Sequence, residues 1–288
     1  MIYLKNAIEY YAFLLIINIL CRLPYKLVLF IVKKLFYVFG YTFGIRKKIV
    51  VKQLRLCFPE KNDEEITDLT KRIYTELAIT VAEVFVFDDK YFEDKIEVIN
   101  FEEVQKALQY NRGLIIISAH FSNWELGVKV AAKHHPPIYG IVKNQRNLLF
   151  NKYINDKREA AGIITIEMKN ALKHVVAAMK QNHIVAIAVD QYAQKQGVEM
   201  DFMGHPTKTY TSAAQLAIKY KIPIIAGFDV RDEKGFHKVV FNEMMLFENI
   251  DYNNDNILEV TAQINRIVED YIKKYPQLWF WVHKKWRK

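Results

Sequence analysis

The sequence predicts an α/β fold in which a central, mostly parallel sheet is flanked by helices. Short apolar runs alternate with segments of helical periodicity from about residue 101 onward, as expected when strands and helices alternate along a chain. Two of these runs, 114–118 and 184–189, are almost wholly apolar, which is typical of buried strands. A chain of 288 residues is also long enough to bury a substantial core.

The individual elements follow in order. A polar loop at 61–65 opens a helix predicted over about 64–87, and a helix over 101–110 leads into the first core strand. Strands are predicted near 114–118, 138–142, 163–166, 184–189, 222–228 and 237–241, and helices near 123–133, 147–161, 169–182, 211–220 and 256–274. The segment 192–211 is predicted as a long loop, and loops of that length are typically functional, here as a lid or substrate contact.

The first 45 residues are predicted as a membrane-anchoring helical segment, followed by an α/β catalytic domain over 46–288. Two apolar runs, 10–21 and 27–43, are punctuated by basic residues, and residues 1–50 hold eight basic residues and one acid. Apolar helices with basic punctuation favour an anchor at the surface of an anionic membrane. A single membrane span and a pair of core helices are the alternatives.

The charge balance predicts an anionic partner. The formal net charge of +9 arises from 41 basic and 32 acidic residues, so a membrane, an acidic ligand or nucleic acid would fit. No segment resembles a nucleic-acid-binding module, and neither G-x-G-x-x-G nor a P-loop occurs, so we expect no nucleic-acid partner. Cys21 and Cys57 lie far apart without a C-x-x-C motif, as is typical of a reducing compartment.

The run 118–126 carries the clearest chemical signal. His120 comes just after the predicted strand 114–118, and Glu125 follows five residues later. Ligands of α/β proteins bind outside the carboxyl ends of strands. A neutral imidazole takes a proton from a hydroxyl near pH 7 when a partner fixes its tautomer. We therefore predict His120 as a general base in the turn before a helix, with Glu125 as its partner in the first helical turn.

Two other interpretations of this run remain open from the residues alone. Ser122 and Glu125 have the spacing of a capping box, in which Glu125 only starts the helix. A metal site would need further ligands at suitable spacing, and His134 and His135 lie at the other end of the predicted helix. The sequence predicts no metal ion and no cofactor.

A second polar group follows the predicted strand 184–189. It consists of Asp190 and Gln191. If the two apolar strands are neighbours, His120 and Asp190 border one cleft, and Asp190 then orients His120 or shapes the acceptor pocket. The alternative is an aspartate that only initiates a turn.

Basic and aromatic side chains complete the set of candidates. Cations near several strand ends would hold phosphates, with solvated surface charge as the alternative: Lys143, Arg146, Arg158 and Arg231.

Trp279, Trp281 and Trp286 lie among basic residues near the C-terminus, a composition that favours a lipid or membrane interface. Nucleic-acid stacking and simple packing of the indoles are the alternatives.

Short motifs along residues 45–288 resemble, in order and spacing, those of the lipid A biosynthesis acyltransferases (lauroyl and myristoyl transferases). These enzymes belong to the wider glycerolipid acyltransferase group. The matching segments are QLRLCFP at 53–59, AHFSNWE at 119–125, REAAG at 158–162, VDQ at 189–191, DFMGHP at 201–206 and PQLWFWVHKKW at 276–286. Gln53, Met203 and Lys285 stand where the family usually has Asn, Phe and Arg.

The resemblance implies a glycerolipid acyltransferase-like fold and a membrane-associated O-acyltransferase at the cytoplasmic face of the cell inner membrane. The donor would be acyl-carrier protein and the acceptor a hydroxyl of a Kdo-bearing lipid A precursor. His120 would be the base, oriented and charged by Glu125. We predict substrate contacts by Asn123, Arg146, Arg158, Asp190, Gln191, Gly204, Lys208 and Arg231. The alternatives are a phospholipid or glycolipid acyltransferase, a thioester or ester hydrolase, and a non-catalytic lipid-binding protein.

Overall fold

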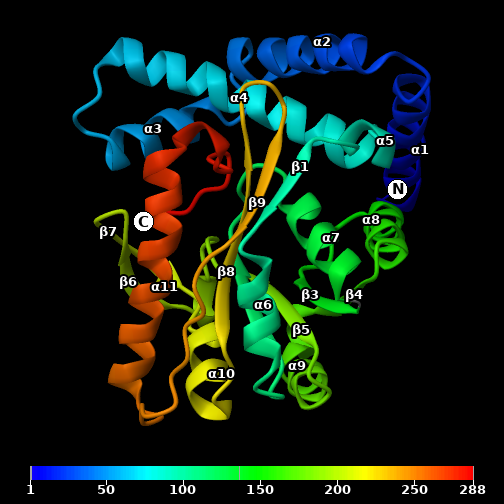
Figure 1. Ribbon diagram of the computed structural model, residues 1–288. Helices are drawn as coiled ribbons and strands as arrows, with labels where there is room; N and C mark the ends of the chain where they lie inside the picture. The colour runs from blue at the N-terminus through cyan, green and yellow to red at the C-terminus, as the bar shows by residue number, and fades with distance from the viewer. Residues whose placement is uncertain (1, 136, 288) are drawn as a thin grey trace.

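The centre of the molecule is a seven-stranded sheet in the order β1-β9-β8-β2-β5-β3-β4 (Figure 1). The computed structural model describes residues 2–135 and 137–287, so Met1, Pro136 and Lys288 of the predicted domains lie outside it. β2 pairs in parallel with β5 and β8, β3 pairs in parallel with β4 and β5, and the β8–β9 pair is antiparallel. The predicted mostly parallel sheet is therefore confirmed.

Six of the seven strands coincide with predicted ones. Their bounds are β1 (Ile96–Ile99), β2 (Leu114–Ser118), β3 (Ile138–Val142), β4 (Ile163–Glu167), β5 (Ile184–Ala188), β8 (Ile224–Arg231) and β9 (His237–Phe241). The strand absent from the prediction is β1, an edge strand of four residues that pairs with β9. Four residues are too few for an apolar alternation to predict a strand.

The helices of the catalytic domain end within two residues of their predicted limits. They are α4 (Asp63–Phe85), α6 (Phe101–Leu108), α7 (Trp124–His134), α8 (Leu148–Ala160), α9 (Ala171–Lys180), α10 (Ser212–Tyr220) and α11 (Asn254–Lys274), with a short α5 (Asp89–Phe92) after α4. α4 begins where the sequence places a polar loop because Asn62 caps it, accepting from the backbone N–H of Glu64 and Glu65, both at 2.9 Å.

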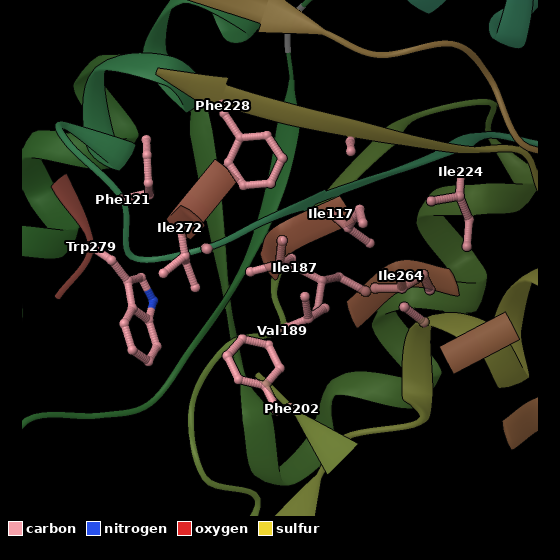
Figure 2. Packing of buried hydrophobic residues seen from close by; sticks show 14 of the residues in the cluster. Ile117, Phe121, Ile187, Val189, Phe202, Ile224, Phe228, Ile264, Ile272 and Trp279 are labelled. Carbon is pink, nitrogen blue, oxygen red and sulfur yellow. The ribbon is translucent and has the colours of Figure 1, made fainter. Parts of the chain in front are cut away.

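The core has two halves because alternate strand residues face opposite sides of the sheet. Ile117 of β2 points to the face covered by α10 and α11, in one cluster with Ile187 and Ile264 (Figure 2). Its neighbour Ile116 points to the other face, against α6 and α7. Burial on both sides leaves the carboxyl ends of the strands as the place where polar side chains can gather.

The N-terminal segment is helical, as predicted. It contains α1 (Ile2–Leu20), α2 (Tyr25–Leu35) and a π-helical stretch η1 (Phe36–Thr42). The helix α3 (Lys47–Cys57) follows at the start of the predicted catalytic domain and is absent from the sequence prediction. In the part of the chain that the structure describes, no single helix qualifies by length and apolarity as a membrane span, but Tyr25–Thr42 and Lys47–Cys57 qualify together as a pair bent by 78°.

One face of this N-terminal segment is covered by core and the other is not. α2 buries Val28 and Val32 against α4, whereas α1 lies beside α8 (Figure 1) through contacts such as Phe13 on Phe150. The large apolar side chains left exposed in this segment include Leu4, Ile8, Tyr11, Leu15, Ile16, Ile19, Phe30, Phe39, Phe43 and Ile45. Two compact core helices would hide most of these side chains, so this alternative does not describe α1.

The prediction of a long loop over 192–211 is wrong. This segment forms a short 3-10 turn (Gln194–Gln196) and an antiparallel hairpin of β6 (Val198–Phe202) and β7 (His205–Thr209). The hairpin turns at Met203 and Gly204, both with positive φ, and its Phe202 enters the core. Polar residues alternating with single apolar ones, and Pro206 within the run, hide the strand pattern.

Candidate functional site

His120 and Asp190 meet at the ends of two adjacent strands. β2 and β5 are neighbours with Ser118 opposite Ala188, so the condition set by the sequence is met. Two residues beyond each strand, His120 Nδ1 lies 2.9 Å from Asp190 Oδ1, and the His120 backbone N–H donates to Asp190 Oδ2 at 3.1 Å. Asp190 is therefore the residue that orients the imidazole, which is one of the two functions considered for it.

The electrostatics of this pair fix the imidazole tautomer. Burial works to raise the pKa of Asp190, but His120 and a hydrogen bond from Trp279 (2.8 Å) outweigh it and hold the pKa at about 2. A carboxylate can only accept, so in the neutral imidazole the proton sits on Nδ1 and Nε2 keeps its lone pair. For His120, burial works to lower the pKa. Asp190 and, more weakly, Glu125 outweigh this effect and raise the pKa above its ordinary value.

The free ring nitrogen faces Gln191. Gln191 Nε2 lies 3.2 Å from His120 Nε2, where an amide N–H can donate to the imidazole lone pair. Trp124 packs edge-on against the imidazole at 5.1 Å between ring centroids, and Phe280 lies 6.1 Å away. Gln191 thus occupies the position that a hydroxyl donor must take when His120 acts as a base.

Glu125 forms an ion pair with Arg158. Arg158 Nε donates to Glu125 Oε2 at 3.0 Å and its second amino group donates to Oε1 at 2.5 Å, a bidentate geometry. Glu125 is predicted both to orient His120 and to stabilise its charge. The orienting contact to the imidazole Nδ1 is made by Asp190 instead. The charge of Glu125 still raises the pKa of His120.

The capping-box interpretation is wrong, because Asn123 and not Ser122 caps α7. Asn123 Oδ1 accepts from Leu126 N at 3.0 Å, and its amide nitrogen donates to Glu83 at 3.1 Å. Asn123 is 2% exposed and its polar atoms are engaged within the protein, but it also belongs to the lining of one of the two cavities at His120, so its substrate contact stays a prediction. Ser122 has φ of +49°, a left-handed conformation that aims its hydroxyl at Asp229.

Two cavities meet at His120. One, of about 780 Å³, carries basic side chains from separate elements and is called the cationic chamber here: Arg46, Lys143, Arg146, Arg158 and Arg287. The other, of about 960 Å³, is called the phenylalanine chamber because its lining includes Phe85, Phe87, Phe92 and Phe280, beside charged residues of α4, α5, α7 and α8. Both chambers include His120, Glu125 and Gln191 in their linings, so the imidazole can reach a group held in either one.

Four of the predicted substrate contacts line neither chamber. Within the described residues these are Asp190, which is the buried partner of His120, and Gly204, Lys208 and Arg231. Gly204 and Lys208 belong to the hairpin β6–β7, and Arg231 is buried against carboxylates of α4. Among the described residues no group of three or more His, Cys, Asp or Glu side chains is placed to hold a metal ion.

The aromatic C-terminal tail packs into the site rather than facing a lipid interface. Trp279 and Trp281 are buried, and Figure 2 shows Trp279 in the core cluster. Phe280 N donates to His120 O at 3.0 Å, and Ser122 N donates to Leu278 O at 2.8 Å, so the tail clamps the turn that carries His120. The packing alternative is therefore confirmed for Trp279 and Trp281.

A buried lysine of the same tail is absent from the sequence prediction of the site. Lys285 Nζ lies 3.4 Å from Gln191 O and over the ring of Phe202, and burial lowers its pKa to about 8. Only its position within the C-terminal motif signals a function, because a single lysine in a basic tail otherwise predicts a solvated charge.

A model of the bacterial lipid A biosynthesis acyltransferase family matches residues 2–288. The chain belongs to this family. It is 23% identical over 249 residues to the lipid A biosynthesis lauroyltransferase of Escherichia coli (strain K12), covering 84% of this chain and 79% of that one. It is 23% identical over 288 residues to a lipid A biosynthesis acyltransferase of Haemophilus influenzae, covering 94% and 87%. Family membership supports a lipid acyltransferase activity.

More distant similarities reach beyond lipid A enzymes. A phosphatidylinositol mannoside acyltransferase of Mycolicibacterium smegmatis is 18% identical over 198 residues, covering 67% of this chain and 63% of that one. The crystal structure of the 1-acyl-sn-glycerophosphate acyltransferase PlsC from Thermotoga maritima aligns with 91% of this chain and 99% of that one, at a TM-score of 0.39 and 13% identity.

Proposed function

We propose that this protein transfers a fatty acyl chain from acyl-carrier protein to a hydroxyl group of a Kdo-bearing lipid A precursor. The observation that supports this most is the His120–Asp190 pair at the junction of two chambers, in a member of the lipid A acyltransferase family. A base between a cationic and an aromatic cavity fits an anionic acceptor on one side and an acyl chain on the other.

The proposed reaction begins when the acceptor hydroxyl displaces Gln191 from His120 Nε2. Nε2 takes the hydroxyl proton while the oxygen attacks the thioester carbonyl carbon. The developing oxyanion is stabilised by the guanidinium of Arg158, which lines both chambers. The C–S bond then breaks, an ester is formed, and the imidazolium returns its proton to the thiolate that leaves. Asp190 stabilises the imidazolium between these two transfers.

The cationic chamber supports a phosphorylated acceptor. Its cations include Arg46, Arg287 and, from the loop after β3, Lys143 and Arg146. These four come from three places in the chain, and none of them forms an ion pair within the described residues. Guanidinium groups free of carboxylate partners are suited to bind phosphate through two hydrogen bonds. A lipid headgroup that carries phosphates would provide the missing countercharge.

The exposed apolar face of the N-terminal segment supports an anchor at the cytoplasmic face of the inner membrane. Phe43 and Ile45 are exposed, and the next residue, Arg46, already lines the cationic chamber. An acceptor lipid could therefore keep its chains in the bilayer while its headgroup reaches the site. Basic residues beside an apolar face are the combination that binds anionic membranes.

Substitution in α1 provides the test of this anchor. Ile8→Gln combined with Leu15→Gln replaces two side chains that are 61% and 62% exposed, so the fold should persist. If both side chains insert into lipid, the pair should weaken binding by at least about 10-fold, given roughly 1.5–3 kcal/mol for each fully buried side chain. Cosedimentation with phosphatidylglycerol vesicles measures this. Leu172→Gln in α9, at a residue 64% exposed, is the control. Equal binding by all variants would contradict the anchor.

The activity itself is tested by incubating the full-length protein with labelled acyl-carrier protein and a purified Kdo-lipid A precursor. We expect labelled lipid to form, and less of it from an acceptor whose phosphates have been removed, because the cationic chamber loses its ligand. Transfer to phospholipid alone would favour the runner-up acceptor. Release of free fatty acid without an acceptor would favour a hydrolase, and binding without turnover a lipid-binding protein.

A further inference from the structure

A set of buried charges lies beneath the turn that separates His120 from Glu125. We call the side chains of Glu83, Asp229, Arg231 and His237 the buried charge cluster; all four are at most 4% exposed. They come from α4 and from the consecutive strands β8 and β9, which lie about 140 residues after α4 in the sequence. Within the described residues, neither Arg231 nor His237 lines either chamber, so the proposed reaction does not use them directly.

His237 sits between two carboxylates. Its Nδ1 lies 2.9 Å and 3.0 Å from the two oxygens of Asp229, and its Nε2 lies 3.2 Å from Glu83 Oε1. Because ionised carboxylates only accept hydrogen bonds, both ring nitrogens must donate, which makes His237 an imidazolium. Burial alone would lower its pKa, but the hydrogen bonds to Asp229 and Glu83 raise it to about 9.

Arg231 supplies the second positive charge. It donates to Glu83 Oε2 at 2.5 Å, and it also donates at 2.6 Å to Oε2 of Glu76, which lies two turns earlier on α4. The two carboxylates of the cluster are therefore matched by two cations, which is what buried charges require. One oxygen of each carboxylate, Asp229 Oδ2 and Glu83 Oε2, faces a cation and also accepts from neutral donors.

Those neutral donors belong to the turn before α7. Ser122 Oγ donates to Asp229 Oδ2 at 2.7 Å, and Asn123 N donates to the same oxygen at 3.0 Å. Asn123 Nδ2 donates to Glu83 Oε2 at 3.1 Å, and Thr80 Oγ1 donates to Ser122 O at 3.3 Å. Four polar atoms of Ser122 and Asn123 are thus hydrogen-bonded to Asp229, Glu83 and Thr80. These contacts fix the backbone at the position where Ser122 adopts its positive φ.

We propose that the buried charge cluster positions the two halves of the His120–Glu125 motif. This inference rests on the acyl transfer proposed above. His237 and Arg231 hold Asp229 and Glu83 in place, and these carboxylates fix the left-handed turn at Ser122. The turn in consequence directs His120 toward Asp190 and Glu125 toward Arg158. The four residues are positioning residues, because their effect on the reaction passes through the turn.

The test replaces His237 and compares it with a matched neighbour. His237→Gln cannot donate to both carboxylates as the imidazolium does, so the turn loses its fixed anchor. We expect kcat to fall about 10- to 100-fold with little change in KM, since a displacement of about 1 Å can cost about 100-fold in rate. Glu76→Gln removes an ion pair of Arg231 without touching the turn, and it should leave kcat near the wild-type value.

A second measurement does not depend on turnover. The pKa of His120, read from the NMR shift of its Cε1–H, should fall in His237→Gln as the contact to Asp190 lengthens, and should stay unchanged in Glu76→Gln. If the wild type transfers no acyl group, the proposed function fails while this measurement still tests the cluster. Unchanged kcat and unchanged His120 pKa in folded His237→Gln would overturn the proposal, as would equal losses in Glu76→Gln.

A milder variant covers the case in which His237→Gln does not fold. Ser122→Ala deletes only the hydroxyl that donates to Asp229. It should lower kcat and the His120 pKa in the same direction, by less than His237→Gln. A Ser122→Ala protein indistinguishable from wild type in both measurements would contradict the positioning function of this contact.

Discussion

His120→Ala is expected to lower kcat by about 10²- to 10⁴-fold, the usual contribution of a general base. The substitution removes the only atom that the proposed reaction uses to take the hydroxyl proton, while both chambers keep their walls. The measurement is the transfer of labelled acyl chains from acyl-carrier protein to the lipid A precursor, with KM determined for both substrates. KM should change little, because the imidazole acts on the transition state rather than on binding.

The control for this prediction is His134→Ala. His134 is an exposed histidine in the last turn of α7, the helix that follows His120, and its ring contacts Phe101 rather than either substrate chamber. We expect near wild-type transfer from it. The thermal midpoints of all proteins should be recorded, because His120→Ala leaves Asp190 buried without its main partner. Near-normal turnover by a folded His120→Ala protein would contradict the proposed mechanism.

The sequence predicts those features of this protein that depend on local periodicity. The apolar run 114–118 forms β2, and a histidine just beyond it comes to the edge of the sheet, as expected when strands of one direction end together. The ends of the helices are predicted to within two residues, because apolar spacing and capping residues such as Asn62 are signals that lie within one or two turns of the helix itself.

The partners within the site depend on contacts between distant residues, which local patterns do not encode. Asp190 is 70 residues from His120 in the sequence, and Trp279 is 89 residues from Asp190. Glu125 is close to His120 in sequence, yet the left-handed turn at Ser122 separates them, and no rule of periodicity predicts that turn. From the sequence alone, Arg231 resembles a phosphate-binding cation. In the fold, α4 places Glu83 against it, so its charge is already paired.

The burial of the C-terminal tryptophans also could not be predicted from local sequence. Indoles among lysines have the composition of a membrane interface, but composition does not report which side of a side chain is covered. In the fold, Trp279 is buried in the core and donates to the buried Asp190. The exposed apolar side chains are concentrated instead in the N-terminal segment, where the sequence predicts the anchor.

Asp190→Asn is the second substitution with a large expected effect, and its reason is geometric. Asp190 Oδ2 accepts from both His120 N and Trp279 Nε1. An asparagine must place its oxygen there, so its NH₂ group takes the place of Oδ1 and points at His120 Nδ1. The imidazole must then carry its proton on Nε2, and the base is lost.

We expect kcat of Asp190→Asn to fall by about 10⁴-fold, the loss seen when an equivalent substitution imposes the wrong tautomer on a catalytic histidine in serine proteases. The matched control is Glu125→Gln, in which the carboxylate near His120 is neutralised but the contact to Nδ1 stays. Glu125→Gln weakens the pair with Arg158 and should cost less than Asp190→Asn. The reverse order of losses would assign the orienting function to Glu125 after all.

The pH profile distinguishes the two carboxylates further. Because the pKa of His120 lies above its ordinary value, kcat/KM of the wild type should rise as pH passes upward through that raised pKa and frees Nε2. Loss of the Glu125 charge removes the smaller of the two attractive contributions, so this limb should move slightly toward lower pH in Glu125→Gln. In Asp190→Asn the larger contribution is lost, and the residual activity should show the limb displaced further in the same direction. A limb that stays in place in both variants would mean that a group other than His120 is titrated, and the assignment of the base would have to be abandoned.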